Sequence, residues 1–244
     1  MKWHEEFEVS SHDVDFNGIA KASSTIRYMQ EAANKQLEAV GPTTKQMTDN
    51  GKAFVLCRVS ASFYAPLYAH DKVEVVTWAG KSERGVILPR CSQVKRDGVI
   101  VAELISTWTV IDIASRRIVR IGNELDKISV DETLELDMPP RFKIPDDVSL
   151  ALTGEYTVSY GVCDINHHMN NTFYPDMLCD FISGGMNGKR IIGLAISYLN
   201  ESVLGETLKV YYANDEYEGK HYFRTVRRDG KIGIEAEITL DEIY

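Results

Sequence analysis

The feature that constrains this chain most is an internal repeat. Residues 15–20 read Asp-Phe-Asn-Gly-Ile-Ala and precede one helix-like stretch, and residues 164–169 read Asp-Ile-Asn-His-His-Met and precede another. Downstream, residues 62–75 parallel residues 197–210, and an Arg-Asp-Gly turn at 96–98 parallels another at 228–230. Matches in the same order predict that one supersecondary unit occurs twice, so each copy can be compared with the other.

Each copy has the pattern of one helix followed by several strands. After the first loop, apolar residues recur at the three- and four-residue steps of a helix with one apolar face: Ile26, Met29, Ala33, Leu37 and Val40. After the second loop, a four-residue step continues toward a Gly-Gly pair: Phe173, Met177 and Phe181. A short strand precedes each helix, at 6–9 and 156–159, and β-branched runs with Asp-Gly turns follow it. Consecutive strands with tight turns predict an antiparallel sheet packed on the helix.

This order of elements resembles the hotdog fold. We therefore predict an α+β double hotdog, with two tandem copies of a long helix wrapped by an antiparallel sheet. Residues 123–149 are charged and contain three prolines, which is typical of a connector. The expected organisation is an N-terminal hotdog at 1–122, a linker at 123–149 and a C-terminal hotdog at 150–244.

The two copies differ in their titratable residues. The Asp and Asn at positions 15 and 17 match Asp164 and Asn166, but Ile19 stands where the second copy has His168. The downstream alignment places Pro66 of the first copy against Glu201 of the second. Only the second copy can therefore perform acid–base chemistry at this place.

The spacing of these residues has a physical use. Asp164, Asn166 and His168 alternate along the chain, so on an extended backbone their side chains can point to one side. They precede a helix, whose first amides lack internal partners and favour developing negative charge. Hydrolysis of an acyl group passes through an oxyanion, for which one donor is worth about 3–4 kcal/mol. A histidine or carboxylate can orient and deprotonate the attacking water.

At this point the sequence resembles a known family. Residues 164–171, Asp-Ile-Asn-His-His-Met-Asn-Asn, closely resemble the Asp-x-Asn-x-His-Val-Asn-Asn signature of acyl-acyl carrier protein (ACP) thioesterases. Residues 198–201, Tyr-Leu-Asn-Glu, resemble the family's Tyr-Arg-Arg-Glu, whose glutamate is regarded as catalytic. A run with Trp108, Asp112 and an arginine pair at 116–117 adds to the likeness. The resemblance implies four catalytic residues: Asp164, Asn166, His168 and Glu201.

The resemblance implies hydrolysis of the thioester of fatty acyl-ACP, which releases free fatty acid and holo-ACP and ends chain growth in fatty acid biosynthesis. No cofactor and no metal are expected. In the preferred scheme His168 and Glu201 activate water, Asn166 and the helix-start amides hold the carbonyl, and Asp164 orients its neighbours. The N-terminal copy would hold the acyl chain. The alternatives are an acyl-CoA thioesterase on the same fold and a non-catalytic acyl-binding hotdog module.

The sequence departs from the family pattern at His167 and at the pair Leu199-Asn200, where the family has arginines. The chain shows no organelle-targeting extension and no signal peptide, which favours a bacterial, cytoplasmic member. We expect either a monomer of two fused hotdogs or a homodimer. No run approaches the roughly 20 apolar residues of a membrane span.

The net charge of −9 argues against binding to nucleic acid, which depends on neutralising phosphates. ACP is itself strongly acidic, so its docking requires a local basic patch. Three clusters are candidates for this patch: Arg116-Arg117-Arg120, Lys189-Arg190 and Arg227-Arg228.

The four cysteines show no CxxC pair, which favours reduced thiols. Cys163 adjoins Asp164 and offers a competing scheme with a cysteine nucleophile. Neighbouring residues on an extended backbone face opposite ways, so we expect Cys163 to point away from the site. The same divergence at His167 and His168 argues against a metal site.

Overall fold

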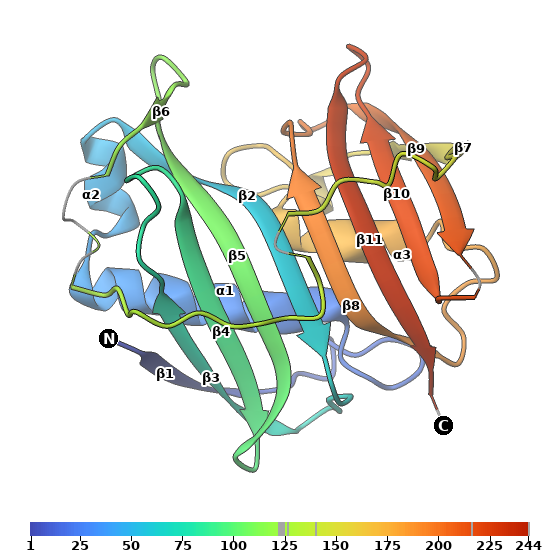
Figure 1. Ribbon diagram of the computed structural model, residues 1–244, viewed down its shortest axis with the longest axis horizontal. Helices are drawn as coiled ribbons and strands as arrows, with labels where there is room; N and C mark the ends of the chain where they lie inside the picture. The colour runs from blue at the N-terminus through green and yellow to red at the C-terminus, as the bar shows by residue number, and fades with distance from the viewer. Residues whose placement is uncertain (122–124, 126, 140, 216, 244) are drawn as a thin grey trace.

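The repeat folds as two sets of elements that occupy opposite halves of one sheet (Figure 1). The computed structural model describes residues 1–244 except 122–124, 126, 140, 216 and 244. The first half contains β1 (Trp3–Glu8), α1 (Ala22–Val40), α2 (Thr44–Asp49), β2 (Lys52–Phe63), β3 (Lys72–Ala79), β4 (Leu88–Arg96), β5 (Val99–Asp112) and β6 (Ile118–Val119). The second half contains β7 (Ala151–Thr157), 3₁₀ turns at Tyr160–Val162 and Asn171–Phe173, α3 (Tyr174–Cys179), β8 (Lys189–Tyr198), β9 (Thr207–Asp215), β10 (Lys220–Val226) and β11 (Ile232–Glu242).

Within the described residues, eleven strands form one sheet in the order β1-β3-β4-β5-β2-β8-β11-β10-β9-β7, with β6 paired to β5. Read inward from either outer edge, this order is the same for each half: first, third, fourth, fifth and second strand. The halves meet where β2 pairs antiparallel with β8, from Arg58 opposite Ser197 to Ser62 opposite Gly193. Because these two central strands run antiparallel, the C-terminal end of β2 and the C-terminal end of β8 lie at opposite ends of the sheet, measured along the strands.

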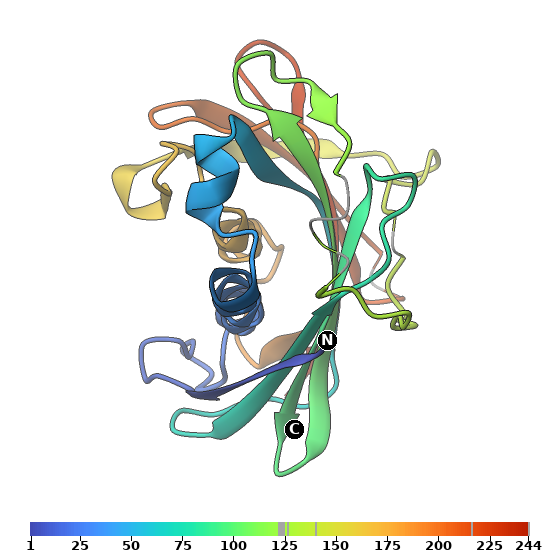
Figure 2. The same cartoon turned by 90° about the vertical axis from the view of Figure 1, so that its left-hand side faces the viewer.

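The helices cover one face of the curved sheet (Figure 2). In α1 the predicted apolar positions Ile26, Met29 and Ala33 are buried, whereas Leu37 is half-buried and Val40 is exposed near the C-terminal end of the helix. Ile26 and Met29 belong to one core that includes residues of both halves, and full burial of such a side chain contributes about 1.5–3 kcal/mol. None of the helices in the described part of the chain is long and apolar enough to cross a membrane.

The second helix is much shorter than the sequence predicted. The expected long helix is reduced to a 3₁₀ turn followed by α3, which has 6 residues and carries a proline at its start. Phe181 and Ile182 lie beyond its end, where Ile182 is still buried. The Phe181 ring lies against Gly154, where an added Cβ would come within 2.9 Å of it. The apolar spacing therefore marked buried side chains correctly, but part of the segment buries them from a turn.

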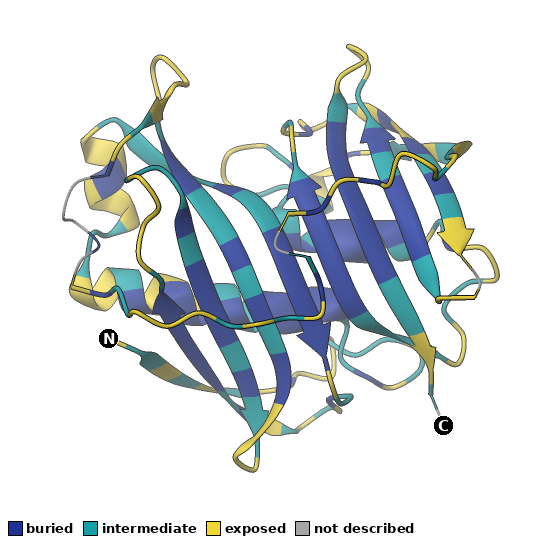
Figure 3. Ribbon diagram, in the orientation of Figure 1, coloured by how far each residue is buried: buried dark blue, intermediate teal, exposed yellow. Residues whose placement is uncertain are grey.

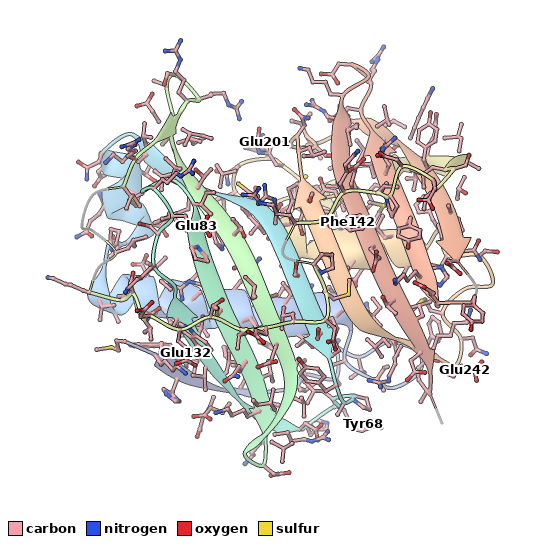
Figure 4. The ribbon with its side chains drawn as sticks, in the orientation of Figure 1. Tyr68, Glu83, Glu132, Phe142, Glu201 and Glu242 are labelled. Atoms are coloured by element: carbon pink, nitrogen blue, oxygen red, sulfur yellow. The ribbon has the colours of Figure 1, made fainter. Side chains whose placement is uncertain are left out.

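The segment that joins the halves crosses the outer face of the sheet, opposite the helices (Figures 2 and 4). Ser60 on β2 donates to the Pro139 carbonyl at 2.6 Å, and Ser197 on β8 donates to the Phe142 carbonyl at 2.7 Å. Phe142 is buried against Tyr222 of β10. Both faces of the central strands are thus covered, and the buried positions run across both halves (Figure 3). The predicted boundary between residues 122 and 123 lies outside the described residues.

Candidate active site

The Asp-Ile-Asn-His-His segment folds into a tight loop closed by its own backbone. The Asp164 amide donates to the His168 carbonyl at 2.9 Å, and the His167 amide donates to the Asp164 carbonyl at 3.0 Å. The Asp164 carboxylate accepts from the backbone N–H of Asn166 at 2.8 Å. His167 takes a left-handed conformation with φ of 60°, which Asn, Asp and His tolerate best among residues with a Cβ. Asp164 therefore shapes the loop and fixes the direction of its neighbours.

The loop brings His168 to Glu201, which lies just beyond the end of β8 (Figure 4). The Met169 amide donates to the Ser202 carbonyl at 2.8 Å, and His168 forms an isolated bridge with Val203. As a result, His168 Nε2 lies 3.5 Å from Glu201 Oε2. The two side chains are 26% and 41% exposed, so water can reach both. An imidazole and a carboxylate at this separation can jointly hold and deprotonate a water molecule.

Two tyrosines hold this part of the site against the second helix. The Tyr174 hydroxyl donates to Ser202 Oγ at 2.9 Å, and the Tyr198 hydroxyl donates to the Asn171 carbonyl at 3.0 Å. Burial raises the pKa of Tyr174 to about 12, so its hydroxyl stays protonated at mildly alkaline pH as well. These contacts fix the segment that carries Glu201. The sequence pattern did not reveal them, because tyrosine spacing alone does not indicate which strand end meets which helix.

The amides at the start of the second helical segment are less free than predicted. The Asn170 side chain accepts from the Thr172 amide at 3.0 Å and from the Thr172 hydroxyl at 2.9 Å. This arrangement is an N-cap, which satisfies one of the donors that a helix start leaves open. This leaves the exposed Asn166 side chain as a donor that is open to a ligand.

The first half repeats the loop with the same backbone hydrogen bonds. The Asp15 amide donates to the Ile19 carbonyl at 2.8 Å, the Gly18 amide donates to the Asp15 carbonyl at 3.0 Å, and the Asn17 amide donates to the Asp15 carboxylate at 2.8 Å. Gly18 has a φ of 78° where the second copy has His167. The alignment of the two loops is therefore confirmed residue by residue.

The alignment of Pro66 with Glu201 is confirmed in the same way. In the first half the Ala20 amide donates to the Leu67 carbonyl at 2.8 Å, as the Met169 amide donates to Ser202 in the second. The residues just before these two acceptors are Pro66 and Glu201. The first copy consequently keeps the frame of the site while presenting Ile19 and Pro66 in place of an imidazole and a carboxylate.

The two asparagines have different surroundings. Asn17 Nδ2 donates to the carbonyls of Met186 at 2.9 Å and Lys189 at 3.1 Å, and its Oδ1 accepts from the Gly188 amide at 3.0 Å. No residue in the described part of the chain forms a hydrogen bond with the Asn166 side chain, which is exposed. Asn17 thus ties the first loop to the second half, whereas Asn166 can donate to a ligand.

A cavity of about 390 Å³ lies beside the first loop. It lies between Ile19 and Pro66 of the first half and Asp176 and Cys179 of α3, and none of the four predicted catalytic residues lines it. Burial raises the pKa of Asp176 and raises that of the Cys179 thiol to about 12, so this thiol is a poor nucleophile. The sequence comparison did not predict this space.

Cys163 lies outside the cluster formed by His168 and Glu201. All four cysteines are free thiols, as the sequence predicted. The Cys163 thiol donates to the Ser159 carbonyl at 3.3 Å.

We expect Cys163→Ala to leave kcat for thioester hydrolysis nearly unchanged, because the variant retains every contact between the loop and Glu201. A steady-state assay of thiol release checks this, and a large loss of kcat would support a cysteine nucleophile instead.

Comparison with known proteins agrees with this geometry. Residues 1–128 match the model of the acyl-ACP thioesterase N-terminal domain, and residues 146–242 match that of the C-terminal domain. The chain is 26% identical over 199 residues to the chloroplastic oleoyl-acyl carrier protein thioesterase 2 of Arabidopsis thaliana, covering 71% of this chain and 52% of that protein. It is 24% identical over 224 residues to the chloroplastic dodecanoyl-[acyl-carrier-protein] hydrolase of Cinnamomum camphora, covering 83% of this chain and 57% of the relative.

The chain therefore spans little more than half the length of these curated relatives. Among solved structures, an acyl-ACP thioesterase from Bacteroides thetaiotaomicron superimposes with a TM-score of 0.88 at 20% identity, covering 98% of each chain. That likeness shows a shared fold, with an antiparallel sheet and few helices. Because the two domain models together match almost the whole sequence, this chain belongs to the acyl-ACP thioesterase family.

Proposed function

We propose that the chain hydrolyses the thioester of fatty acyl-ACP and releases free fatty acid and holo-ACP. The observation that supports this most strongly is the pairing of His168 with Glu201 at 3.5 Å, with the exposed Asn166 two residues before His168 on the same loop, in a member of this family. Relatives named for oleoyl and dodecanoyl substrates support a fatty acyl substrate. No step in this reaction requires a cofactor.

In the proposed mechanism, His168 and Glu201 hold a water molecule and remove its proton. The water oxygen attacks the carbonyl carbon of the thioester, and the carbonyl oxygen becomes an oxyanion. The side-chain amide of Asn166 donates to that oxygen, while Asp164 keeps the loop in place. The carbon–sulfur bond then breaks, the sulfur of the carrier takes up the proton, and the fatty acid leaves.

We further propose that the two halves are hotdog units, with boundaries at 1–122, 123–149 and 150–244. The repeated strand order and the matching loops support this division. The acyl chain would lie in the first unit, whose inner face is lined by apolar residues of α1 and β2. In this arrangement the second unit supplies the chemistry and the first binds most of the substrate.

The direct test of the proposed function is incubation with a panel of acyl-ACP thioesters that spans dodecanoyl to oleoyl chains, followed by identification of the acids released. Comparison of kcat/KM for matched ACP and CoA thioesters then establishes which carrier is preferred. Release of no acid from any member of the panel would contradict the proposal. A clear preference for CoA would replace ACP as the carrier and leave the hydrolysis intact.

The structure narrows the candidates for carrier docking. Arg190 is mostly buried and lies near Asp241, and Arg227 is paired with a largely buried glutamate, which leaves one basic residue, Lys189 or Arg228, for a partner in each of these clusters. Arg117 is exposed in the hairpin that follows β5, and Arg120 is exposed just beyond the end of β6. The same hairpin carries Arg116, which contacts Glu201. We therefore assign docking of the acidic carrier to Arg117 and Arg120.

Reversing both charges, with Arg117→Glu and Arg120→Glu together, should raise KM for acyl-ACP by about tenfold, because the acidic carrier would then meet like charge. The same variant should hydrolyse dodecanoyl-N-acetylcysteamine, a thioester without a carrier, at the wild-type rate. Steady-state kinetics with both substrates measures the difference. An unchanged KM for acyl-ACP would place docking elsewhere.

A further inference from the structure

Arg116 reaches the proposed active site from the other half of the chain. It lies in the tight hairpin between β5 and β6, with a left-handed φ of 56°. The Arg116 amide donates to the Asp112 carbonyl at 2.8 Å, and the Asp112 carboxylate accepts from both the amide and the hydroxyl of Ser115 at 2.7 Å. These bonds give the hairpin a fixed shape, so Arg116 extends from a defined backbone.

The side chain of Arg116 ends on the carboxylate of Glu201. Arg116 Nη2 lies 2.6 Å from Glu201 Oε2, which is the same oxygen that lies 3.5 Å from His168 Nε2. Of these two contacts, only the one with Arg116 has the length of a hydrogen bond. A glutamate has three rotatable side-chain bonds, and this contact selects the rotamer that faces His168.

The contribution of this ion pair to stability is small. Arg116 is 66% exposed and Glu201 is 41% exposed, and exposed pairs of this kind typically contribute about 0–1 kcal/mol. Removal of Arg116 therefore leaves the fold intact, and a large loss of turnover in such a variant would report on the chemistry.

We propose that Arg116 is a positioning residue that holds Glu201 against His168, so that the active site is assembled from both halves. This inference rests on the proposed function, because it assigns Arg116 a role only through Glu201. The pairing of β2 with β8 makes it possible, since β5 and β8 then lie on either side of β2 and finish at the same end of the sheet. The first copy presents Pro66 at the matching position, which offers no carboxylate for an arginine to hold.

The test uses dodecanoyl-N-acetylcysteamine as substrate, because this thioester carries no phosphate or carrier that Arg116 could bind. Arg116→Gln should lower kcat by about tenfold with little change in KM, since misplacing a catalytic group costs rate rather than binding. Arg116→Lys should recover much of the loss, because it keeps a cation that can reach the carboxylate. Arg84→Gln is the matched control: Arg84 is also exposed on a loop of the first half, with a φ of 55°.

Three outcomes would decide against the inference. An unchanged kcat in Arg116→Gln, with Glu201→Ala inactive, would overturn the role of Arg116 and leave the proposed function standing. An increase in KM confined to acyl-ACP, with normal turnover of the small thioester, would make Arg116 a carrier contact. Full activity in Glu201→Ala would overturn both the inference and the proposed role of Glu201 in activating water, while hydrolysis itself would stand. Thermal unfolding of each variant confirms that the chain is folded.

Discussion

Replacing His168 or Glu201 with alanine should reduce kcat for acyl thioester hydrolysis by about 10²–10⁴-fold, the range that positioned general acid–base groups supply. Both side chains are partly exposed, and their closest ionic contacts are with each other and with Arg116. Their removal therefore takes away chemistry while the buried core is unaffected. Release of the thiol product measures kcat, and thermal unfolding verifies the fold.

The chain offers a matched control for this experiment. His4 Nδ1 lies 2.8 Å from Glu74 Oε1 on the outer strands β1 and β3, with side chains 57% and 43% exposed. His4→Ala and Glu74→Ala should leave kcat unchanged, because this pair is far along the sheet from the second loop. Near-normal turnover in both His168→Ala and Glu201→Ala would show that the water is activated by other groups.

Asn166→Ala should lower kcat and Asn17→Ala should lower stability, although the two residues occupy the same position of the repeat. Asn166→Ala should lower kcat by about 10²–10³-fold, the loss typical of one oxyanion donor, with no change in unfolding. Asn17→Ala should retain kcat and lower the free energy of unfolding by about 0.5–1.5 kcal/mol, because it removes the hydrogen bonds that tie the first loop to the partly exposed backbone at 186–189.

Denaturant unfolding and steady-state kinetics on the same four proteins, including the wild type and the double variant, separate the two effects. The effects of the two substitutions on kcat and on the free energy of unfolding should add in the double variant, because the two loops lie at opposite ends of the central strands. A comparable loss of kcat in Asn17→Ala would mean that the first loop takes part in the reaction.

The sequence alone predicted the repeat, the antiparallel sheet and the position of both loops. Those predictions succeeded because they depend on local patterns, such as an Asp-x-Asn turn before a helix and apolar strands joined by Asp-Gly. The alignment of Pro66 with Glu201 followed from the same patterns, and the amides of Ala20 and Met169 confirm it.

The length of the second helix could not be predicted, because Met177 and Phe181 mark buried positions whether the backbone is helical or turned. Arg116 could not be assigned to Glu201 either. Their contact depends on β2 joining β8, and such a tertiary pairing leaves no signal in the spacing of either segment. The cavity beside Ile19 could not be predicted for the same reason, since it lies between elements of different halves.

The two Asp-Gly turns lie between equivalent strands, as the repeat predicted, but the arginines that precede them are not equivalent. Arg227, and not Arg228, makes the contact that Arg96 makes in the first half. Arg96 Nη1 lies 2.7 Å from Asp71 Oδ2, and Arg227 Nε lies 3.0 Å from Glu206 Oε1. The loop from β10 to β11 is longer than the loop from β4 to β5, so Arg227 lies farther from its Asp-Gly turn than Arg96 does.

The join between β2 and β8 also determines how such a molecule can evolve. In a symmetric pair of identical subunits, every mutation occurs at both sites at once, so neither site can be given up without the other. Here the two sites are encoded separately. One could lose its imidazole and carboxylate and turn its asparagine into a structural tie, while the other kept its reactive groups and recruited an arginine from its neighbour. Two copies of a unit on one chain can therefore differ in chemistry while they share a fold.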